Sequence, residues 1–302
     1  MLHFDAAATR ARLPLPALVD ALRAMFSAGC TVPARHVHTV GEGTVLIMPA
    51  WREGAFLGIK TVNVFAGNAA CGLPALHSIY TLFDARTGQP LAQMGGDEIT
   101  TRRTVAASAL AASFLARSDA RRLLVVGAGR VAGLLPEAMR SVRPGLDDVT
   151  VWSRRPEQAL KLAQVVGGRA VSDLEAAVRN ADIVSCATLA GEPLVRGAWL
   201  QPGTHLDLIG SFTPAMREAD GAAVQRARVF VDTAEALAKS GDLLQAIAEG
   251  AFDAAMLQGT LAALCRSEVQ GRRDAEEVTL FKSVGTALED LAAAEQVWSA
   301  PR

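Results

Sequence analysis

Long apolar runs and a surplus of one charge are both missing from this chain of 302 residues. None of its apolar runs approaches the roughly twenty residues that a membrane-spanning helix requires. The chain has 30 basic and 31 acidic residues, for a formal net charge of −1, and therefore lacks the basic surplus typical of nucleic-acid-binding proteins. We expect neither a membrane nor a nucleic acid as a partner.

Cysteine is scarce, and its spacing contains no C-x-x-C pair. The four cysteines are Cys30, Cys71, Cys186 and Cys265, a scatter that fits neither a zinc site nor a disulfide framework. The 5 histidines are too dispersed to form a metal centre. The first residues, Met1 to Asp5, lack the basic and apolar segments of a secretory leader. We therefore expect reduced thiols, no metal and a cytoplasmic location.

Half of the residues are hydrophobic and the mean hydropathy is +0.23, so the chain can bury a large core. Its length is typical of one large or two medium domains. The first stretch predicts a helix at 17–30, followed by short strands and then a long alanine-rich helix that starts at Thr101 or Thr104 and ends near Arg117. The strands are expected at 35–40, 44–48, 56–64, 78–83 and 90–94.

The middle of the chain alternates short apolar strands with helical segments. The strands are expected at 123–126, 149–152, 182–186, 205–209 and 229–231, and the intervening helices include 130–140 and 156–166. This alternation predicts an α/β fold with a doubly wound parallel sheet. The chain after Asp232 has helical patterning, and its last segment, 284–298, is amphipathic.

A glycine-rich motif joins the first of these strands to its helix. Gly127-Ala128-Gly129-Arg130-Val131-Ala132 has the G-x-G-x-x-A form of the dinucleotide-binding fingerprint. The first glycine permits a tight turn, the second lets the backbone approach a pyrophosphate, and the small last residue lets the helix pack closely. Strand, motif, helix and second strand occur in the required order. They predict a Rossmann-type nucleotide site.

The end of the second strand bears on which nucleotide is bound. NAD sites usually place a carboxylate there to bind the ribose 2′-hydroxyl, whereas this chain has Trp152-Ser153-Arg154-Arg155. A hydroxyl and two guanidinium groups suit a 2′-phosphate. We expect Ser153, Arg154 and Arg155 to bind NADPH, with NADH as a weaker cofactor. The alternative is a solvated helix start with two surface arginines.

Several further segments together resemble the ornithine cyclodeaminase/μ-crystallin family over nearly the whole chain. They are Gly58 to Asn63, Gly72-Leu73-Pro74, Leu82-Phe83-Asp84 with Thr87-Gly88, Ile99-Thr100 with Arg103-Thr104 and Ala106-Ala107, Gly127 to Ala132, Ile209-Gly210 with Pro214 and Glu218, and Phe281 to Gly285. The resemblance implies a substrate-binding and dimerisation domain at 1–117, a Rossmann domain at 118–285, and a C-terminal helix at 286–302 that returns to the first domain. It also implies a homodimer.

The resemblance implies that Arg35, Lys60 and Arg103 hold the substrate carboxylate. Lys60 either anchors that carboxylate or, if desolvation lowers its pKa, protonates the substrate nitrogen. The cyclodeaminase branch of the family has an aspartate two residues before the proline of its Gly…Pro-x-x-x-Glu loop, where this chain has Phe212. A phenyl ring cannot pair with the side-chain ammonium of ornithine. Phe212 therefore favours a substrate without a second amine.

Other residues are expected near the ligands. His77 is a candidate substrate contact. The expected cofactor contacts are Thr104, Ser108, Gly127, Ala128, Gly129, Arg130, Val131, Ser153, Arg154, Arg155, Thr188, Lys282 and Ser283.

The resemblance, together with Phe212, implies NADPH-dependent reduction of cyclic imino acids. The reactions would convert Δ1-pyrroline-2-carboxylate to L-proline and Δ1-piperideine-2-carboxylate to L-pipecolate, and this chemistry needs a carboxylate anchor and a hydride donor. The alternatives are an ornithine cyclodeaminase, an enzyme like alanine dehydrogenase, and a non-catalytic protein that binds NADPH and a small ligand, as a crystallin does.

Overall fold

The computed structural model describes residues 1–301, which form two compact units. Unit 1 consists of Met1–Arg103 with the C-terminal segment from Thr286, and unit 2 is Thr104–Gly285. The expected domain boundary lay after residue 117, at the end of the long helix. The units instead divide within this helix, α3 (Gly96–Leu115), between Arg103 and Thr104.

Unit 1 contains a six-stranded sheet in the order β1-β6-β5-β4-β3-β2. The neighbours from β2 to β6 are antiparallel, and β1 pairs with β6 in parallel at the edge. The strands are β1 (Leu2–Phe4), β2 (His36–Val40), β3 (Gly43–Trp51), β4 (Phe56–Val64), β5 (Leu76–Asp84) and β6 (Pro90–Gly95). The helices are α1 (Ala6–Ala11), α2 (Leu15–Ala28), the 3-10 turn Ala66–Cys71 and α11 (Ala287–Ser299).

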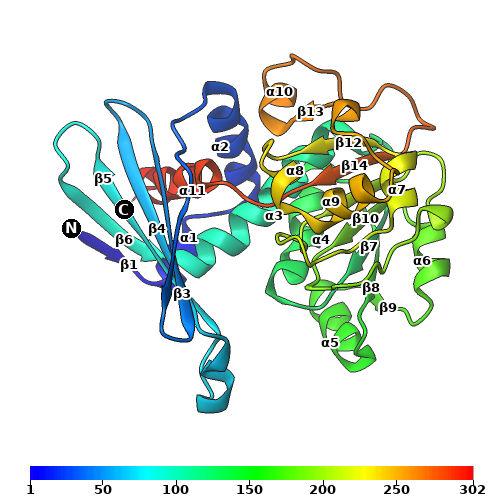
Figure 1. Ribbon diagram of the computed structural model, residues 1–302, viewed down its shortest axis with the longest axis horizontal. Coiled ribbons are helices and arrows are strands. Elements are labelled where there is room, and N and C mark those ends of the chain that lie inside the picture. The colour runs from blue at the N-terminus through cyan, green and yellow to red at the C-terminus, as the bar shows by residue number, and fades with distance from the viewer. Residues whose placement is uncertain (302) are drawn as a thin grey trace. The chain divides into compact units, whose positions relative to one another are not determined.

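One face of this sheet is covered by helix, with α11 packed on β3, β4 and α2 (Figure 1). Side chains alternate between the two faces of a strand, and Met48, Lys60, Val62 and Tyr80 point to the covered face, where they are buried. Most of the buried residues of α11 are apolar, but Glu289 and Asp290 are buried as well. This arrangement places polar side chains of β4 against the first turn of α11.

Unit 2 is built on an eight-stranded parallel sheet in the order β13-β12-β14-β11-β10-β7-β8-β9. The strands are β7 (Arg122–Val126), β8 (Asp148–Trp152), β9 (Arg169–Ala170), β10 (Ile183–Cys186), β11 (His205–Leu208), β12 (Arg228–Val231), β13 (Gly259–Thr260) and β14 (Thr279–Lys282). The order β9-β8-β7-β10-β11 is the 3-2-1-4-5 arrangement of a Rossmann sheet. The predicted doubly wound α/β fold is therefore confirmed.

Short helices connect these strands. They are α4 (Arg130–Val142), α5 (Pro156–Val166), α6 (Leu174–Asn180), α7 (Gly221–Arg226), α8 (Ala236–Lys239), α9 (Gly241–Ala248), α10 (Leu261–Cys265) and the 3-10 turns Gly197–Trp199 and Ala254–Met256. The core between them is dominated by aliphatic residues of the central strands, such as Leu124, Val184 and Leu206. In the part of the chain that is described, no helix is long and apolar enough to cross a membrane.

Two local predictions were wrong. The long helix begins at Gly96 and not at Thr101 or Thr104, because Asp97 and Glu98 occupy its first turn, where carboxylates interact favourably with the helix dipole. The region after Asp232 is not only helical. Strand β14 pairs with both β11 and β12 and is fully buried in the sheet.

Candidate active site

The nucleotide fingerprint forms the turn between β7 and α4. Gly127 has φ 123°, and a Cβ on it would lie 2.6 Å from the carbonyl oxygen of Ala187. Its N–H donates to the carbonyl of Trp152 at 2.8 Å. Helix α4 follows with Gly129 as its N-cap, and no side chain caps it. The N-terminal amides of α4 are thus placed as in helices that bind a pyrophosphate, and the segment fits a dinucleotide.

The loops after three neighbouring strands meet at the carboxyl edge of the sheet. Gly127 follows β7, Ala187 and Thr188 follow β10, and Gly210 follows β11. The backbone of Thr188 lies so close to Gly210 that a Cβ there would overlap it. In doubly wound folds the ligand binds outside the carboxyl ends of the strands where the winding direction changes. These loops surround that point.

A buried carboxylate joins two of these loops. Glu218 Oε1 accepts hydrogen bonds from the N–H and the Oγ1 of Thr188, each at 2.7 Å, and its Oε2 accepts from the N–H groups of Gly210 at 2.8 Å and Ser211 at 3.3 Å. Burial raises the pKa of Glu218 to about 7, while the charge of Lys282 opposes that rise. The expected cofactor residue Thr188 is therefore held in place through its side chain.

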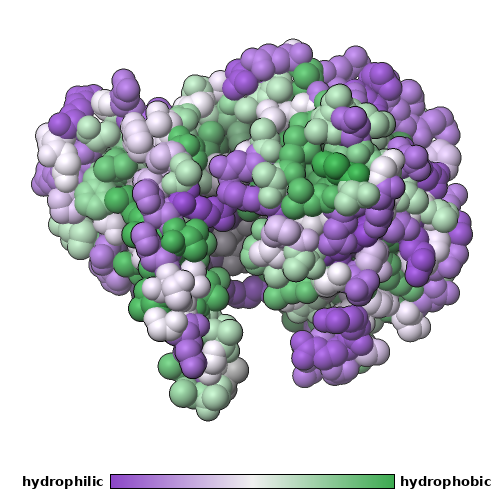
Figure 2. Space-filling view, in the orientation of Figure 1, coloured by the Kyte–Doolittle hydropathy of each residue, from purple (hydrophilic) through white to green (hydrophobic). Residues whose placement is uncertain are grey.

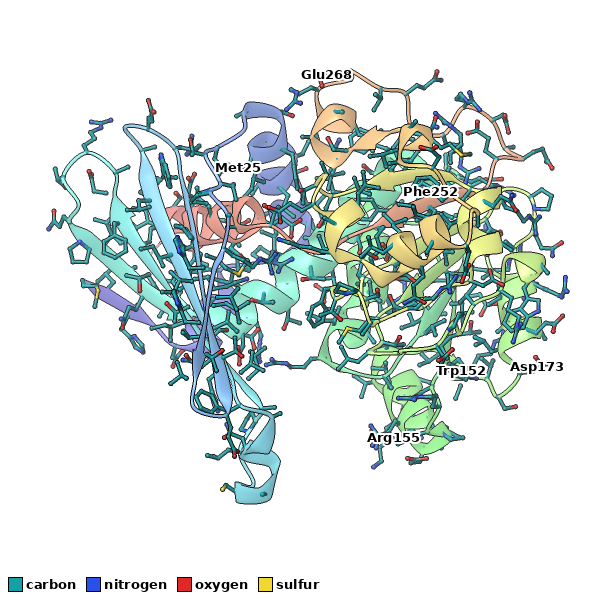
Figure 3. All side chains as sticks on the ribbon, viewed as in Figure 1. Met25, Trp152, Arg155, Asp173, Phe252 and Glu268 are labelled. Carbon is teal, nitrogen blue, oxygen red and sulfur yellow. The ribbon has the colours of Figure 1, made fainter. Side chains whose placement is uncertain are left out.

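The segment after β8 is exposed and basic. Arg154 and Arg155 are exposed, and Ser153 Oγ accepts from the Arg155 N–H at 3.3 Å. Arg155 is the N-cap of α5, and Figure 3 shows it at the start of that helix, close to the end of β8 at Trp152. The surface over α5 is hydrophilic (Figure 2). No carboxylate stands between Trp152 and Pro156.

Lys282 and Ser283, expected as cofactor contacts, point into the interior of unit 2. Lys282 Nζ lies 3.0 Å from Asp242 Oδ2, and both side chains are fully buried. Ser283 Oγ donates to Asp232 Oδ2 at 2.9 Å. Their polar side-chain atoms thus contact internal carboxylates, and a cofactor contact through these side chains finds no support in the geometry.

Two expected cofactor residues on α3 differ in their surroundings. Ser108 is buried and donates to Asp207 Oδ1 at 3.0 Å. Asp207 also accepts a hydrogen bond from Ser185, and burial raises its pKa to about 6. The Ser108 hydroxyl therefore ties α3 to the sheet. Thr104 is half-buried at the start of the unit 2 part of the helix.

In unit 1, Lys60 and Arg103 meet two acids of α11. Lys60 Nζ lies 2.6 Å from Asp290 Oδ2, Arg103 Nε lies 3.0 Å from Asp290 Oδ1, and Arg103 donates to Glu289 Oε2 at 2.6 Å. Burial lowers the pKa of Lys60, and the charge of Asp290 counteracts this. The charges of Lys60 and Arg103 also keep the pKa of Asp290 below its usual value, against the effect of its burial.

The three other predicted substrate residues differ in their surroundings. Arg35 is half-buried in the segment before β2. His77 pairs with Asn63 and is exposed. Its position alternates with that of Tyr80, so it occupies the sheet face opposite Lys60, and the structure does not bring it to the Lys60 cluster. Phe212 follows β11 in unit 2 and is 48% exposed, as an apolar contact for a ligand requires.

The sequence reasoning missed the acids that hold these groups. Glu289 and Asp290 are consecutive acids in an alanine-rich helix and are fully buried. Charged residues are rarely buried unless they are paired, so an acidic pair on the apolar face was a usable signal. Glu218 stood within a recognised motif but was given no role. Among residues 1–301, no group of three or more potential ligands could hold a metal ion.

A Rossmann sheet with a glycine turn at its switch point defines the class of this protein as one with a dinucleotide-binding fold. A sequence model of the ornithine cyclodeaminase/mu-crystallin family matches residues 8–300. The chain belongs to this family, as its motifs predicted.

Individual proteins and solved structures are also similar to this chain over nearly its full length. The Δ1-pyrroline-2-carboxylate reductase of Paracoccus denitrificans is 44% identical over 288 residues, which cover 92% of this chain and 91% of that protein. The structure of the Thermococcus litoralis Δ1-pyrroline-2-carboxylate reductase with NADH and L-proline has a TM-score of 0.92 at 31% identity, covering 99% of this chain and 96% of that one. An archaeal alanine dehydrogenase dimer with bound NAD has a TM-score of 0.91 at 27% identity, covering 99% and 95%.

Proposed function

We propose that this protein is an NADPH-dependent reductase of cyclic imino acids, which forms L-proline from Δ1-pyrroline-2-carboxylate and L-pipecolate from Δ1-piperideine-2-carboxylate. The observation that carries the proposal is the 44% identity, over nearly the full length, to a Δ1-pyrroline-2-carboxylate reductase. The buried cations Lys60 and Arg103 support it, because they suit an anionic substrate.

The reduction requires few groups. The hydride would come from a reduced nicotinamide when that cofactor is bound. Lys60 and Arg103, with Arg35, hold the substrate carboxylate by charge-assisted hydrogen bonds and so orient the C=N bond. The nitrogen must carry a proton for its carbon to accept hydride, and Lys60 is the candidate donor in unit 1. Phe212 packs against an apolar ring and offers no partner for a second amine, which disfavours ornithine as substrate.

The preference for NADPH rests on the segment after β8. Arg154 and Arg155 supply two guanidinium groups at the N-terminus of α5, where the helix dipole also favours an anion. The three residues Ser153 to Arg155 contain no carboxylate that would repel a 2′-phosphate, and the nearest acid is Glu157 in the first turn of α5. NADH lacks this phosphate and is expected to bind more weakly, although the Thermococcus relative was solved with NADH.

A second candidate is alanine dehydrogenase-like reductive amination of pyruvate. It is favoured by the TM-score of 0.91 to the archaeal alanine dehydrogenase. The two activities share a carboxylate next to a C=N bond, but an open-chain substrate has no ring to pack against Phe212.

We also propose a homodimer in the cytoplasm. None of the four cysteines, all of which lie in the described part of the chain, forms a disulfide. The sheet face of unit 1 opposite Lys60 carries half-buried or exposed apolar side chains, and apolar surface over unit 1 is visible in Figure 2. Those on β3, β4 and β5 are Ile47, Trp51, Leu57, Ile59, Ile79 and Phe83. An apolar patch of this kind is typical of a protein interface.

The test is a substrate panel with purified protein. Pyrroline-2-carboxylate, piperideine-2-carboxylate, pyruvate with ammonia, and ornithine are each supplied with NADPH or NADH, and the absorbance of the reduced cofactor is followed. Ornithine conversion is measured by its products, because its cofactor is recycled. We expect turnover of both cyclic imino acids and a higher kcat/KM with NADPH. Turnover of pyruvate with ammonia alone, or proline formed from ornithine alone, would contradict the proposal.

A further inference from the structure

One carboxylate in unit 1 contacts both cations that we assign to the substrate. Asp290 Oδ2 lies 2.6 Å from Lys60 Nζ, and Asp290 Oδ1 lies 3.0 Å from Arg103 Nε. The three side chains come from α11, β4 and α3, elements that are distant in sequence. The side chain of Asp290 is fully buried, and those of Lys60 and Arg103 are 3% and 8% exposed. The two cations are thus fixed relative to each other by a single group.

The backbone around Asp290 leaves it little freedom. It lies in the first turn of α11, whose N-cap Thr286 accepts a hydrogen bond from the Leu288 N–H at 3.4 Å. The neighbouring residues Leu291 and Ala293 are fully buried. A carboxylate in the first turn also interacts favourably with the helix dipole. Asp290 therefore acts from a rigid support, as a residue that positions others must.

The charges around Lys60 depend on Asp290. Lys60 faces Asp290 and Glu289 from α11 and Arg103 from α3, and Tyr80 faces the cluster from β5. Burial and Arg103 both lower the pKa of Lys60, Asp290 raises it most, and Glu289 adds a smaller effect. Burial raises the pKa of Tyr80 well above its usual value, so Tyr80 stays neutral. Without the Asp290 charge, nothing of comparable strength opposes the desolvation of Lys60.

We propose that Asp290 is a positioning residue of the imine reductase, which holds the Lys60 ammonium and the Arg103 guanidinium in one arrangement for the substrate carboxylate. The inference rests on the proposed function for its kinetic consequence. It holds whether Lys60 anchors the carboxylate or protonates the nitrogen, because both roles require the charged ammonium.

Glu289 provides a matched control. It precedes Asp290 in the same turn, is equally buried, and contacts Arg103 at 2.6 Å. Its contribution to the charge state of Lys60 is smaller than that of Asp290. Asp290→Asn and Glu289→Gln each remove one buried negative charge with little change in shape. A general effect of losing a buried acid would appear in both variants.

The experiment compares the pH dependence of kcat/KM for pyrroline-2-carboxylate in the wild type, Asp290→Asn and Glu289→Gln. We expect the alkaline limb of the Asp290→Asn profile to move to lower pH by about 1 to 3 units, the size of shift that an adjacent opposite charge produces. Glu289→Gln should move it distinctly less. Equal movement in the two variants, or none in Asp290→Asn, would overturn the proposal.

A second measurement does not depend on turnover. Lysine side-chain NMR titration of the ligand-free protein reports the ionisation of Lys60, assigned by its loss in Lys60→Met. If the wild type reduces no imino acid but the Lys60 titration moves to lower pH in Asp290→Asn, the proposed function fails and the positioning role stands. If imino acids are reduced and the titration does not move, the positioning role fails.

Asp290→Glu decides the question if Asp290→Asn does not fold. It keeps the charge but moves the carboxylate, so we expect the wild-type alkaline limb with kcat/KM lowered at least about tenfold, as for a misplaced catalytic group. An unchanged kcat/KM in this variant would refute the positioning role.

Discussion

Replacement of Lys282 by methionine tests whether this lysine stabilises unit 2 or contacts the cofactor. Its ammonium lies 3.0 Å from Asp242 Oδ2, and neither side chain is exposed. Asp242 Oδ1 accepts from the N–H groups of Glu218 at 2.7 Å and Ala219 at 3.0 Å. Removing the lysine charge leaves Asp242 buried without its cation and next to a second acid.

The expected cost follows from this geometry. Breaking a buried ion pair by removing one partner destabilises a protein by about 3 to 5 kcal/mol. For a unit of this size each kcal/mol lowers the melting temperature by about 2 to 4 °C, so Lys282→Met should melt about 6 to 20 °C below the wild type. Adding Asp242→Asn removes the unpaired charge and keeps an acceptor for the two N–H groups. The double variant should recover most of the loss.

The assay is thermal unfolding of the ligand-free proteins, followed by circular dichroism at neutral pH. NADPH affinity is measured separately by fluorescence. A direct cofactor contact at Lys282 predicts the opposite pattern, with an unchanged melting temperature and weaker NADPH binding. That pattern, or a double variant no more stable than Lys282→Met alone, would refute the structural role.

Two further predictions concern the nucleotide site. Gly127→Ala should weaken the binding of NADPH and NADH alike, at least about tenfold by fluorescence titration. The added Cβ would lie 2.6 Å from the Ala187 carbonyl oxygen, and the φ of this residue is positive. An affinity near that of the wild type would contradict the tight turn. Joint replacement of Arg154 and Arg155 by alanine should raise the KM for NADPH about tenfold or more and leave the KM for NADH nearly unchanged. Lys161→Ala, at an exposed position of α5, is the control. Equal effects on the KM of both cofactors would contradict a phosphate site.

The part of the fold that local patterns determine could be predicted from the sequence. Strands β7 and β8, the glycine turn between β7 and α4, and the helix at 156–166 were placed correctly, because each is encoded by neighbouring residues. Strand β14 was missed, although Val278, Leu280 and Phe281 are apolar, because it pairs between two strands from earlier in the chain. Its role depends on long-range pairing that spacing does not reveal.

In the candidate site, too, local motifs could be predicted from the sequence, whereas long-range contacts could not. Lys60 and Arg103 came from family motifs, and the structure brings them together. Their shared partner Asp290 could not be inferred from either motif, because it comes from a helix at the other end of the chain. His77 and Lys282 were chosen for their chemistry and their neighbours in sequence. His77 instead lies on the sheet face opposite Lys60, and Lys282 points into the interior of unit 2.

The division of unit 1 between both ends of the chain has a consequence for biosynthesis. During translation, residues 1–103 emerge first, and Lys60 and Arg103 then lack the two acids of α11. Unit 2 is continuous and has all of its strands once residue 285 has left the ribosome. Domains generally fold as units when their residues become available, so unit 2 can reach its native state before unit 1. The N-terminal sheet lacks the two acids that neutralise its buried cations until the last helix has been synthesised.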